Sequence, residues 1–342
     1  MTAAASPSGR PSLLSDSQRL SHLRWMILAR VLDDRMSMLY KQSQIAGSVF
    51  TGRGQEAFSA AGGMFLRQGD VFAPMIRDLA GRLAFGEPIL EGIRTYLGRR
   101  TGPMRGRDGN IHRGSPSKGL LPMISHLGAM VSVTCGVLVA RRLQGRLSGN
   151  DLAVGMTAIG DGGMAAGALH EGLNLAAVEK LPLVLMVTNN QLSYSTLNDR
   201  SFACKHLVDR ALGYGVQGHA CDGTDADACL STMQEAVARA RRGEGPQMVV
   251  ATLLRLAGHG AHDDALYVPA DLKSRFGDCL QLSERTLKLQ GVASEASIQA
   301  LWDEVRKEVD QAVEQVRKEP PPDPDEEDWC AYSTRDLTKV RT

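Results

Sequence analysis

Polar side chains that can bind a hard cation follow two successive apolar runs of this chain. Asp161 lies in a Gly-Asp-Gly-Gly sequence with Gly160, Gly162 and Gly163, and Asn190 ends an Asn-Asn pair after the next apolar run. Carboxylate and carboxamide oxygens are ligands that Mg²⁺ accepts, and a protein-bound Mg²⁺ usually keeps positions open for phosphate oxygens. The two side chains therefore predict a metal site for a phosphate-bearing ligand.

The segments around these residues predict one β-α-β unit. Residues 152–159 and 181–187 are continuous apolar runs of the kind that parallel strands bury on both faces, and residues 165–178 carry apolar side chains at helical spacing. Ligands of open parallel sheets bind beyond the carboxyl ends of strands, where Asp161 and Asn190 both fall. Taken separately, each has a simpler interpretation, as a helix-capping Gly-Asp turn and an Asn-rich turn.

The spacing of Gly-Asp-Gly and Asn-Asn resembles the signature of thiamin diphosphate enzymes. The run GALHEGLNLAAVEKLPLVLMVTNN is similar to the α subunit of the decarboxylating first component of 2-oxo acid dehydrogenase complexes, a family that acts on pyruvate, acetoin or branched-chain 2-oxo acids. The resemblance implies an α/β thiamin diphosphate-binding fold, with a doubly wound, mostly parallel sheet flanked by helices. Further motifs of that family occur in the same order at residues 54–57, 76–78, 106–112, 221–225 and 258–264.

The resemblance also implies which residues hold the cofactor. Asp161, Asn190 and the backbone carbonyl of Leu192 would ligate an Mg²⁺ that bridges the two phosphates, and Arg77 matches an arginine that pairs with the diphosphate. The family commonly has a tyrosine before that arginine, and Ile76 removes one hydroxyl contact here. The cofactor-binding residues implied are Arg77, Ser125, Leu127, Gly160, Asp161, Gly162, Gly163, Asn190, Leu192 and His259. Leu127 would press between the cofactor rings, with a core position as its alternative.

Two histidines match catalytic positions of that family. His259 would contact the diphosphate or move a proton as a neutral imidazole. Mammalian relatives have a phosphorylated serine directly after it, which Gly260 replaces here, and a further histidine two residues before it, where this chain has Ala257. His262 is a candidate to replace that histidine in part. His112 matches a second pocket histidine near the 2-oxo acid, with a purely structural role as its alternative.

The implied chemistry needs partners. A thiazolium ylide accepts the electrons that loss of CO₂ leaves behind, and the glutamate that activates it in this family comes from a separate β subunit. We therefore expect an inactive chain alone, an α₂β₂ assembly, and acyl transfer to a lipoyl group on an acyltransferase. Two alternatives stay open, a split transketolase-like carboligase and a noncatalytic assembly paralogue. The sequence does not separate pyruvate, branched-chain and acetoin types; Asp263 and Asp264 resemble the branched-chain loop slightly more.

Composition excludes other classes of function. The 39 basic and 38 acidic residues give a formal net charge of +1, which predicts neither a nucleic-acid nor an anionic-membrane partner. No apolar run approaches the ~18 residues that span a bilayer. The six cysteines show no CxxC pairing, as expected of thiols in a reducing compartment. The N-terminus lacks a secretion signal, and we favour the bacterial cytoplasm over the mitochondrial matrix.

The chain is expected to form one large domain. We expect a disordered tail over residues 1–16, the α/β domain over residues 17–319, and a Pro-rich acidic linker with a C-terminal arm over residues 320–342. Long helices are predicted over residues 17–44, at a subunit interface, and over residues 294–319, capped by Ser294 with Ser297 as the alternative. Residues 124–140 are expected to pack against the sheet, residues 249–254 to form a strand, and the basic residues 98–119 to form a phosphate-facing loop.

Overall fold

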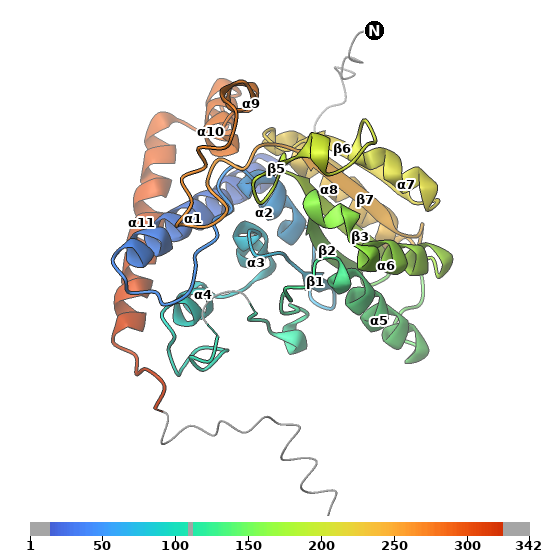
Figure 1. Ribbon diagram of the computed structural model, residues 1–342, viewed down its shortest axis with the longest axis horizontal. Helices are drawn as coiled ribbons and strands as arrows, with labels where there is room; N and C mark the ends of the chain where they lie inside the picture. The colour runs from blue at the N-terminus through green and yellow to red at the C-terminus, as the bar shows by residue number, and fades with distance from the viewer. Residues whose placement is uncertain (1–13, 109–111, 324–342) are drawn as a thin grey trace, which may run out of the picture.

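Five parallel strands form the centre of the molecule (Figure 1). The structure is a computed structural model that describes residues 14–108 and 112–323. The strand order is β1-β2-β3-β7-β6, and the predicted strands at residues 152–159, 181–187 and 249–254 correspond to the second, third and fourth of these. The parallel sheet flanked by helices confirms the expected fold class. The strands are β1 (Val71–Ala73), β2 (Gly155–Gly160), β3 (Leu183–Asn189), β7 (Gln247–Thr252) and β6 (Gln217–Asp222).

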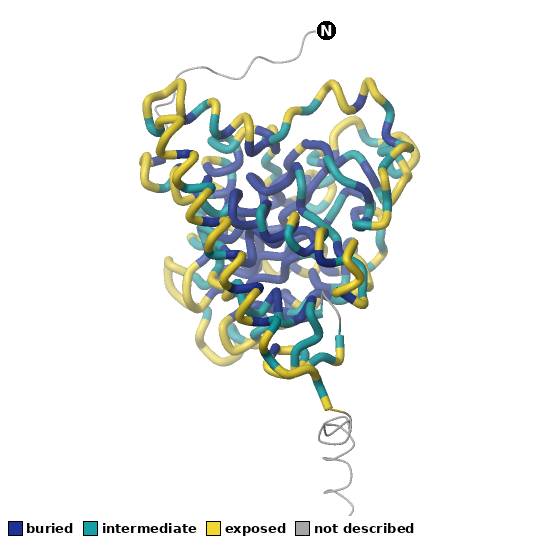
Figure 2. Tube along the Cα trace, turned by 90° about the vertical axis from the view of Figure 1, so that its left-hand side faces the viewer, coloured by how far each residue is buried: buried dark blue, intermediate teal, exposed yellow. Residues whose placement is uncertain are grey.

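Strand β3 is buried on both faces because it lies between two separate apolar cores. Val184 and Met186 contribute to one core, whereas Leu183, Leu185 and Val187 alternate with them into the other. This explains why the strand reads as a continuous apolar run instead of an alternating one. The tube view shows the same centre as a fully buried region beneath exposed helix surfaces (Figure 2).

Helices cover the two faces of the sheet in separate groups. Helices α5 (Ala129–Leu143) and α6 (Gly167–Val178) enclose the smaller core together with α7 (Arg210–Gly213). Helices α2 (Glu56–Met64), α3 (Leu79–Phe85) and α8 (Ala226–Arg241) pack against the other face. The predicted helices at residues 165–178 and 124–140 are therefore present, the latter shifted towards the C-terminus.

A further layer of helices covers the second face. Helix α1 (Asp16–Lys41) lies against α11 (Glu295–Arg317), with α4 (Ile89–Tyr96), α9 (Ala270–Arg275) and α10 (Cys279–Leu289) around them (Figure 1). Leu23, Met26 and Ile27 of α1 are fully buried within this chain, so its apolar pattern does not by itself indicate a subunit interface. Helix α11 begins after Ser294, whose side chain accepts a hydrogen bond from the Ser297 backbone, as the capping prediction required.

The connections differ in how well the sequence predicted them. Residues 98–108 and 112–119 are a loop apart from the short helix η1 (Pro116–Lys118). A small hairpin of β4 (Leu192–Ser193) and β5 (Thr196–Leu197) follows Asn190, where the sequence analysis predicted no strand. Short helical turns complete the chain at η2 (Gly162–Ala165), η3 (Asn198–Arg200) and η4 (Leu207–Asp209). The predicted tail lies outside the described residues up to residue 13, and the predicted arm does so from residue 324 onwards.

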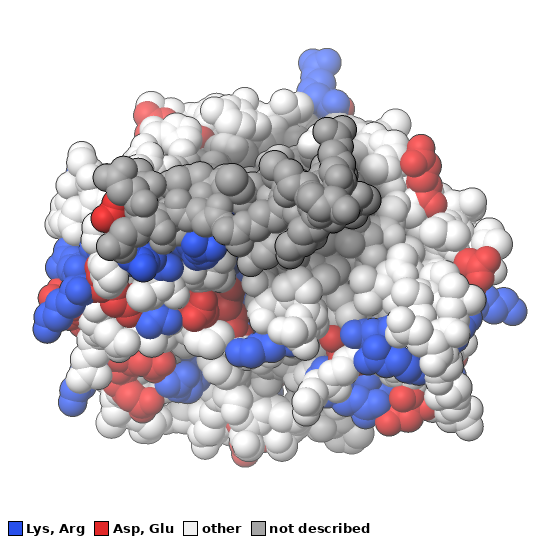
Figure 3. Space-filling model, turned by 90° about the horizontal axis from the view of Figure 1, so that it is seen from below, with Lys and Arg blue, Asp and Glu red and all other residues white. Residues whose placement is uncertain are grey.

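The charged surface is mixed in sign. The face shown in Figure 3 carries Lys and Arg beside Asp and Glu, without one large basic patch. Among the helices of residues 14–108 and 112–323, none combines the length and apolarity needed to cross a bilayer.

Candidate functional site

A cavity of about 270 Å³ lies beyond the carboxyl ends of β2, β3 and β7. This volume is slightly below the usual range of about 300–1,000 Å³ for small-molecule sites. The cavity collects every cofactor-binding candidate that the sequence suggested, whereas the candidate histidines His112 and His262 do not line it. Those candidates are Arg77, Ser125, Leu127, Gly160, Asp161, Gly162, Gly163, Asn190, Leu192 and His259.

Asp161 presents a buried carboxylate oxygen with no hydrogen-bond partner. The residue follows β2 directly and is 2% exposed. Its Oδ1 accepts a hydrogen bond of 2.8 Å from the Gly162 backbone, so the turn-capping interpretation holds for one oxygen, while Oδ2 has no partner among the described residues. Burial raises the pKa of the carboxyl group to about 6. A buried carboxylate normally needs a cation or donors to offset its desolvation, so Oδ2 fits a metal ligand.

Asn190 lies at the end of the neighbouring strand with its amide orientation fixed. Its Nδ2 donates to Gln55 Oε1 at 3.3 Å, and its Oδ1 accepts from the Leu192 backbone N–H at 3.3 Å. Gln55 is 3% exposed and comes from the chain segment before α2. The carboxamide oxygen Oδ1 therefore points towards Leu192 at the start of the β4–β5 hairpin. One carboxylate, one carboxamide and one backbone carbonyl are an oxygen set suited to Mg²⁺.

Two buried guanidinium groups face the cavity without a carboxylate partner within 4.0 Å among the described residues. Arg77 is 8% exposed and donates to the carbonyls of Thr51 at 3.1 Å and His259 at 2.6 Å. Arg255 is 3% exposed and donates to the carbonyls of Ala257 and Tyr194 at 3.0 and 2.8 Å. Burial and the neighbouring Arg255 lower the pKa of Arg77 to about 10, which still leaves it charged at neutral pH. Two uncompensated positive charges in one cavity favour an anion such as a diphosphate.

His259 lies between aromatic rings beside these arginines. Its ring centroid is 4.2 Å from that of Tyr194 and 5.3 Å from that of Phe50, and its Nδ1 is 3.4 Å from an Arg77 nitrogen. Burial, Arg77 and Arg255 lower the pKa of His259 to about 4. The imidazole is therefore neutral at physiological pH, as the sequence interpretation assumed, and can accept or donate a hydrogen bond inside the cavity.

Asp263 holds the loop that carries His259. Its Oδ2 accepts hydrogen bonds from the His259 backbone N–H at 2.6 Å and from the Tyr267 hydroxyl at 2.7 Å. Tyr267 also accepts from Arg255 at 2.7 Å, so the loop and the buried arginine share one network. His262 is exposed and does not line the cavity, which gives no support to its suggested replacement of a histidine at position 257.

A short segment before α5 forms part of the cavity wall. Leu127 is 44% exposed and lines the cavity, which excludes a core position for it. Gly163 packs under it, where a Cβ atom would lie 2.7 Å from Ile159 Cγ1. A Cβ on Gly160 would meet no atom within 4 Å. The small residues therefore leave space beside Asp161 for a ligand.

His112 lies at the edge of the cavity without lining it. Its Nε2 is 3.2 Å from Ser125 Oγ, which does line the cavity, and its Nδ1 is 2.5 Å from Asp108 Oδ2. The side chain is 36% exposed. An exposed imidazole with two polar partners is not a buried structural histidine, so the geometry favours the functional alternative.

Sequence reasoning gave no site role to several residues of the cavity, and three of them make contacts that matter to the site. Arg255, Gln55 and Tyr194 all line it, and each lies close in sequence to a motif that had been singled out. Arg255 was detectable because it follows the last apolar run by one residue, at the same sheet edge as Asp161 and Asn190. Gln55 lies inside the motif at residues 54–57 but was given no role, and Tyr194 gave no signal, since their roles depend on hydrogen bonds and ring contacts across the chain.

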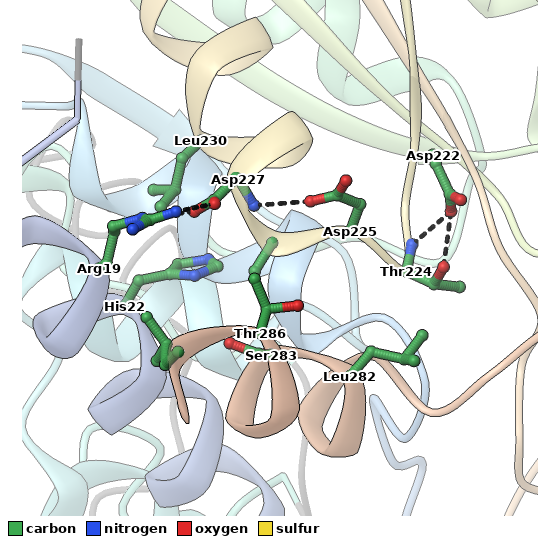
Figure 4. Close-up of a pocket in the computed structure, with 12 residues that line it drawn as sticks. Arg19, His22, Asp222, Thr224, Asp225, Asp227, Leu230, Leu282, Ser283 and Thr286 are labelled. Atoms are coloured by element: carbon green, nitrogen blue, oxygen red, sulfur yellow. Dashed lines mark hydrogen bonds and ion pairs between the residues drawn. The ribbon is translucent and has the colours of Figure 1, made fainter. Parts of the chain in front are cut away.

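A second cavity of about 200 Å³ lies between α1, α8 and α10. Figure 4 shows that its polar groups bind one another: Asp222 accepts from Thr224, Asp225 accepts from the Asp227 backbone, and Arg19 pairs with Asp227. The motif at residues 221–225 therefore serves to begin α8, with Asp225 as the N-cap. The polar groups of this second cavity bind one another, so the cavity beside residues 160–163 remains the candidate site.

Comparisons with known proteins give one consistent result. A sequence model of the family described as dehydrogenase E1 component matches residues 23–325. The α subunit of acetoin:2,6-dichlorophenolindophenol oxidoreductase from Cupriavidus necator is 31% identical over 330 residues, which cover 95% of this chain and 97% of that protein. The α subunit of 2-oxoisovalerate dehydrogenase from Bacillus subtilis is 31% identical over 312 residues, covering 90% and 93%. The E1 α subunit of pyruvate dehydrogenase from Rhizobium meliloti is 30% identical over 313 residues, covering 90% and 88%.

Proposed function

The chain belongs to the dehydrogenase E1 component family, and on that basis we propose how its cavity works. It is the α subunit of a 2-oxo acid dehydrogenase, an oxidoreductase that depends on thiamin diphosphate. The relatives described above are named as dehydrogenase or oxidoreductase α subunits, which favours this function over a carboligase. One observation carries the proposal. Among the described residues, Asp161 Oδ2 has no hydrogen-bond partner, and it lines a cavity with two arginines that form no salt bridge.

These residues fit a metal-bound diphosphate. We assign Asp161, Asn190 and the carbonyl of Leu192 to Mg²⁺, because their oxygens suit a hard cation and Asp161 Oδ2 is otherwise unsatisfied. Arg77 and Arg255 balance the remaining negative charge of the phosphates, and the neutral His259 lies close enough to donate to one of them. Ser125, Leu127 and the three glycines form the wall along the middle of the ligand.

When bound, thiamin diphosphate supplies the electron sink that decarboxylation requires. The residues of this chain position the ligand, neutralise its charge and exclude water from the inner end of the cavity. His259 and His112 are the groups that can hold or move a proton near the 2-oxo acid. Neutral His259 can accept a proton or donate a hydrogen bond, since its pKa of about 4 leaves it unprotonated at neutral pH.

The chain supplies half of the active site. Among the described residues that line the cavity, the acidic side chains are Asp78 and Asp161, and none is a glutamate. We propose that the glutamate that activates the cofactor comes from a β subunit, in an α₂β₂ assembly. We propose that the acyl group then passes to a lipoyl group on an acyltransferase partner, and that the complex works in the bacterial cytoplasm. Neither a nucleic acid nor a membrane is part of this proposal.

The test is turnover of a panel of 2-oxo acids and acetoin by the chain co-purified with its β subunit. Reduction of an artificial electron acceptor is measured with thiamin diphosphate and Mg²⁺ for pyruvate, branched-chain 2-oxo acids and acetoin. Dependence on one of these substrates supports the dehydrogenase, and the best substrate identifies its type. A folded complex that binds the cofactor but turns over none of them would point to a carboligase or a noncatalytic paralogue.

A further inference from the structure

An aspartate, a histidine and a serine form one hydrogen-bonded chain at the mouth of the cavity. Asp108 Oδ2 lies 2.5 Å from His112 Nδ1, and His112 Nε2 lies 3.2 Å from Ser125 Oγ. Ser125 lines the cavity, whereas the His112 side chain is 36% exposed and the Asp108 side chain 27%. The hydrogen bonds therefore connect a hydroxyl group that lines the cavity with an imidazole that water can reach.

The carboxylate determines which imidazole nitrogen carries the proton. An ionised carboxylate only accepts hydrogen bonds, so His112 Nδ1 donates to Asp108. In the neutral imidazole this leaves Nε2 as the acceptor, and the Ser125 hydroxyl donates to it. One aspartate thus fixes both the tautomer and the direction of the serine hydroxyl.

The backbone that carries His112 is fixed by buried ion pairs. Arg113 is 4% exposed, and its guanidinium lies 3.0 Å from Glu87, which also accepts from Arg82 at 2.7 and 2.9 Å. Burial opposes ionisation of Glu87, but the two arginines outweigh it and lower its pKa to about 2. Such support is what holds a functional side chain in one geometry. His112 is therefore anchored at its next residue and oriented through its own ring.

We propose that Asp108 is a positioning residue that sets His112 and Ser125 as a proton relay for the reaction in the cavity. The inference rests on the proposed function. A proton released in the cavity passes to Ser125 Oγ while the Ser125 proton passes to His112 Nε2. The imidazolium that forms stays paired with the Asp108 carboxylate and releases a proton to water, and the reverse sequence delivers a proton into the cavity. No oxidant or further reactant is needed.

The kinetic test uses Asp108→Asn and Asp108→Glu in the complex with the β subunit. Because the amide offers Nδ1 a donor as well as an acceptor, Asp108→Asn should lower kcat at least about tenfold, within the range that general acid–base groups contribute. KM and thiamin diphosphate affinity should stay within about twofold, because Asp108 is not among the cavity residues. Asp108→Glu should recover part of kcat. Asp303→Asn, a change at an exposed carboxylate of α11, is the matched control.

A structural readout separates this inference from the proposed function. Nitrogen-15 imidazole spectra of the full chain, assigned with His112→Gln, should show a single Nδ1–H tautomer at His112 and a mixture of tautomers in Asp108→Asn. An unchanged kcat in an active complex, or an unchanged tautomer in Asp108→Asn, would overturn the relay. If the wild-type complex turns over no substrate, the proposed function fails instead, and the spectra alone decide whether Asp108 orients His112.

Discussion

At the scale of single residues, the cavity is defined by charges that lack partners within the chain. Asp161 keeps one carboxylate oxygen unsatisfied, and Arg77 and Arg255 lie buried beside it without a carboxylate partner among the described residues. Each of these features is unfavourable in an empty cavity and favourable once an Mg²⁺-bound diphosphate is present. These unpaired charges therefore lower the stability of the ligand-free fold and favour binding of the ligand.

Replacing Asp161 with asparagine should reduce Mg²⁺-dependent binding of thiamin diphosphate. The amide keeps the size of the side chain but removes the negative charge, so affinity should fall by about tenfold or more, since even outer groups of metal sites change metal affinity by about 10–100-fold. Calorimetric titration of the complex with and without Mg²⁺ measures this. Asp151→Asn, at a side chain that is 69% exposed, is the control and should bind normally. Equal affinities for the Asp161 variant and the control would contradict the metal assignment.

Replacing Arg255 with lysine should weaken diphosphate binding although the charge is kept. Its guanidinium donates to Ala257, Tyr194 and Tyr267 at once, and an ammonium group on a flexible stem cannot reproduce that fork. We expect an affinity lower by about tenfold, equal to the loss of one charged hydrogen bond of ~1.4 kcal/mol. The exposed Arg285→Lys on α10 serves for comparison. Wild-type affinity in Arg255→Lys would show that the charge alone matters.

At the scale of elements, buried ion pairs fix the helices that carry the cavity loops. Arg30 of α1 bonds to Glu56 of α2 at 2.5 Å and to Asp278 beside α10 at 2.9 Å. Glu56 also accepts from the Gly54 backbone at 2.8 Å, next to the Gln55 that orients Asn190. These hydrogen bonds therefore hold α1, the start of α2 and the residue before α10 together next to the cavity.

Removing the positive charge of Arg30 should destabilise the fold strongly. Arg30→Met leaves the Glu56 carboxylate, which is 1% exposed, without its partner, and breaking such a buried pair costs about 3–5 kcal/mol. Denaturant unfolding followed by circular dichroism gives the change in unfolding free energy. Arg142→Met removes a half-exposed pair with Glu179 and should change it by less than about 1 kcal/mol. A loss at Arg30 no larger than at Arg142 would disprove the anchoring role.

A buried histidine in α1 should make stability depend on pH. His22 is 1% exposed and donates to the Ala57 carbonyl at 2.8 Å, and burial lowers its pKa to about 4. Between about pH 6.5 and about pH 4 the unfolded chain binds the extra proton, so unfolding free energy falls as pH falls, by about 2 kcal/mol between pH 7 and pH 5 for this group. His22→Gln keeps the donor but does not titrate, and should lose correspondingly less. Identical pH dependence in both proteins would refute the assignment.

The sequence predicted those elements whose pattern is local. The strands before Asp161 and Asn190 and the cap at Ser294 follow from apolar runs and one side chain, and the structure contains them. Contacts across the chain were not predictable: Gln55 meets Asn190 from a segment 135 positions away, and the hairpin after Asn190 depends on left-handed backbone at Gln191 and Tyr194. Neither residue type signals such a conformation on its own.

At the scale of the whole molecule, the fold brings the ends of three strands to one cavity and leaves that cavity open. The inner end is built from this chain, with its charges and glycines, whereas Ser125 and Leu127 at the mouth are exposed. A site whose inner end is complete and whose mouth is uncovered suits assembly with a second subunit. This is the central claim of the proposed function.

Reconstitution from separately purified subunits tests that claim most directly. The chain, its β subunit and their mixture are compared for 2-oxo-acid-dependent acceptor reduction with thiamin diphosphate and Mg²⁺ at saturating concentrations. We predict background activity for each subunit alone and activity in the mixture that rises with added β subunit until the two are equimolar. Full activity of this chain alone, or none in a well-folded mixture that binds the cofactor, would contradict the account.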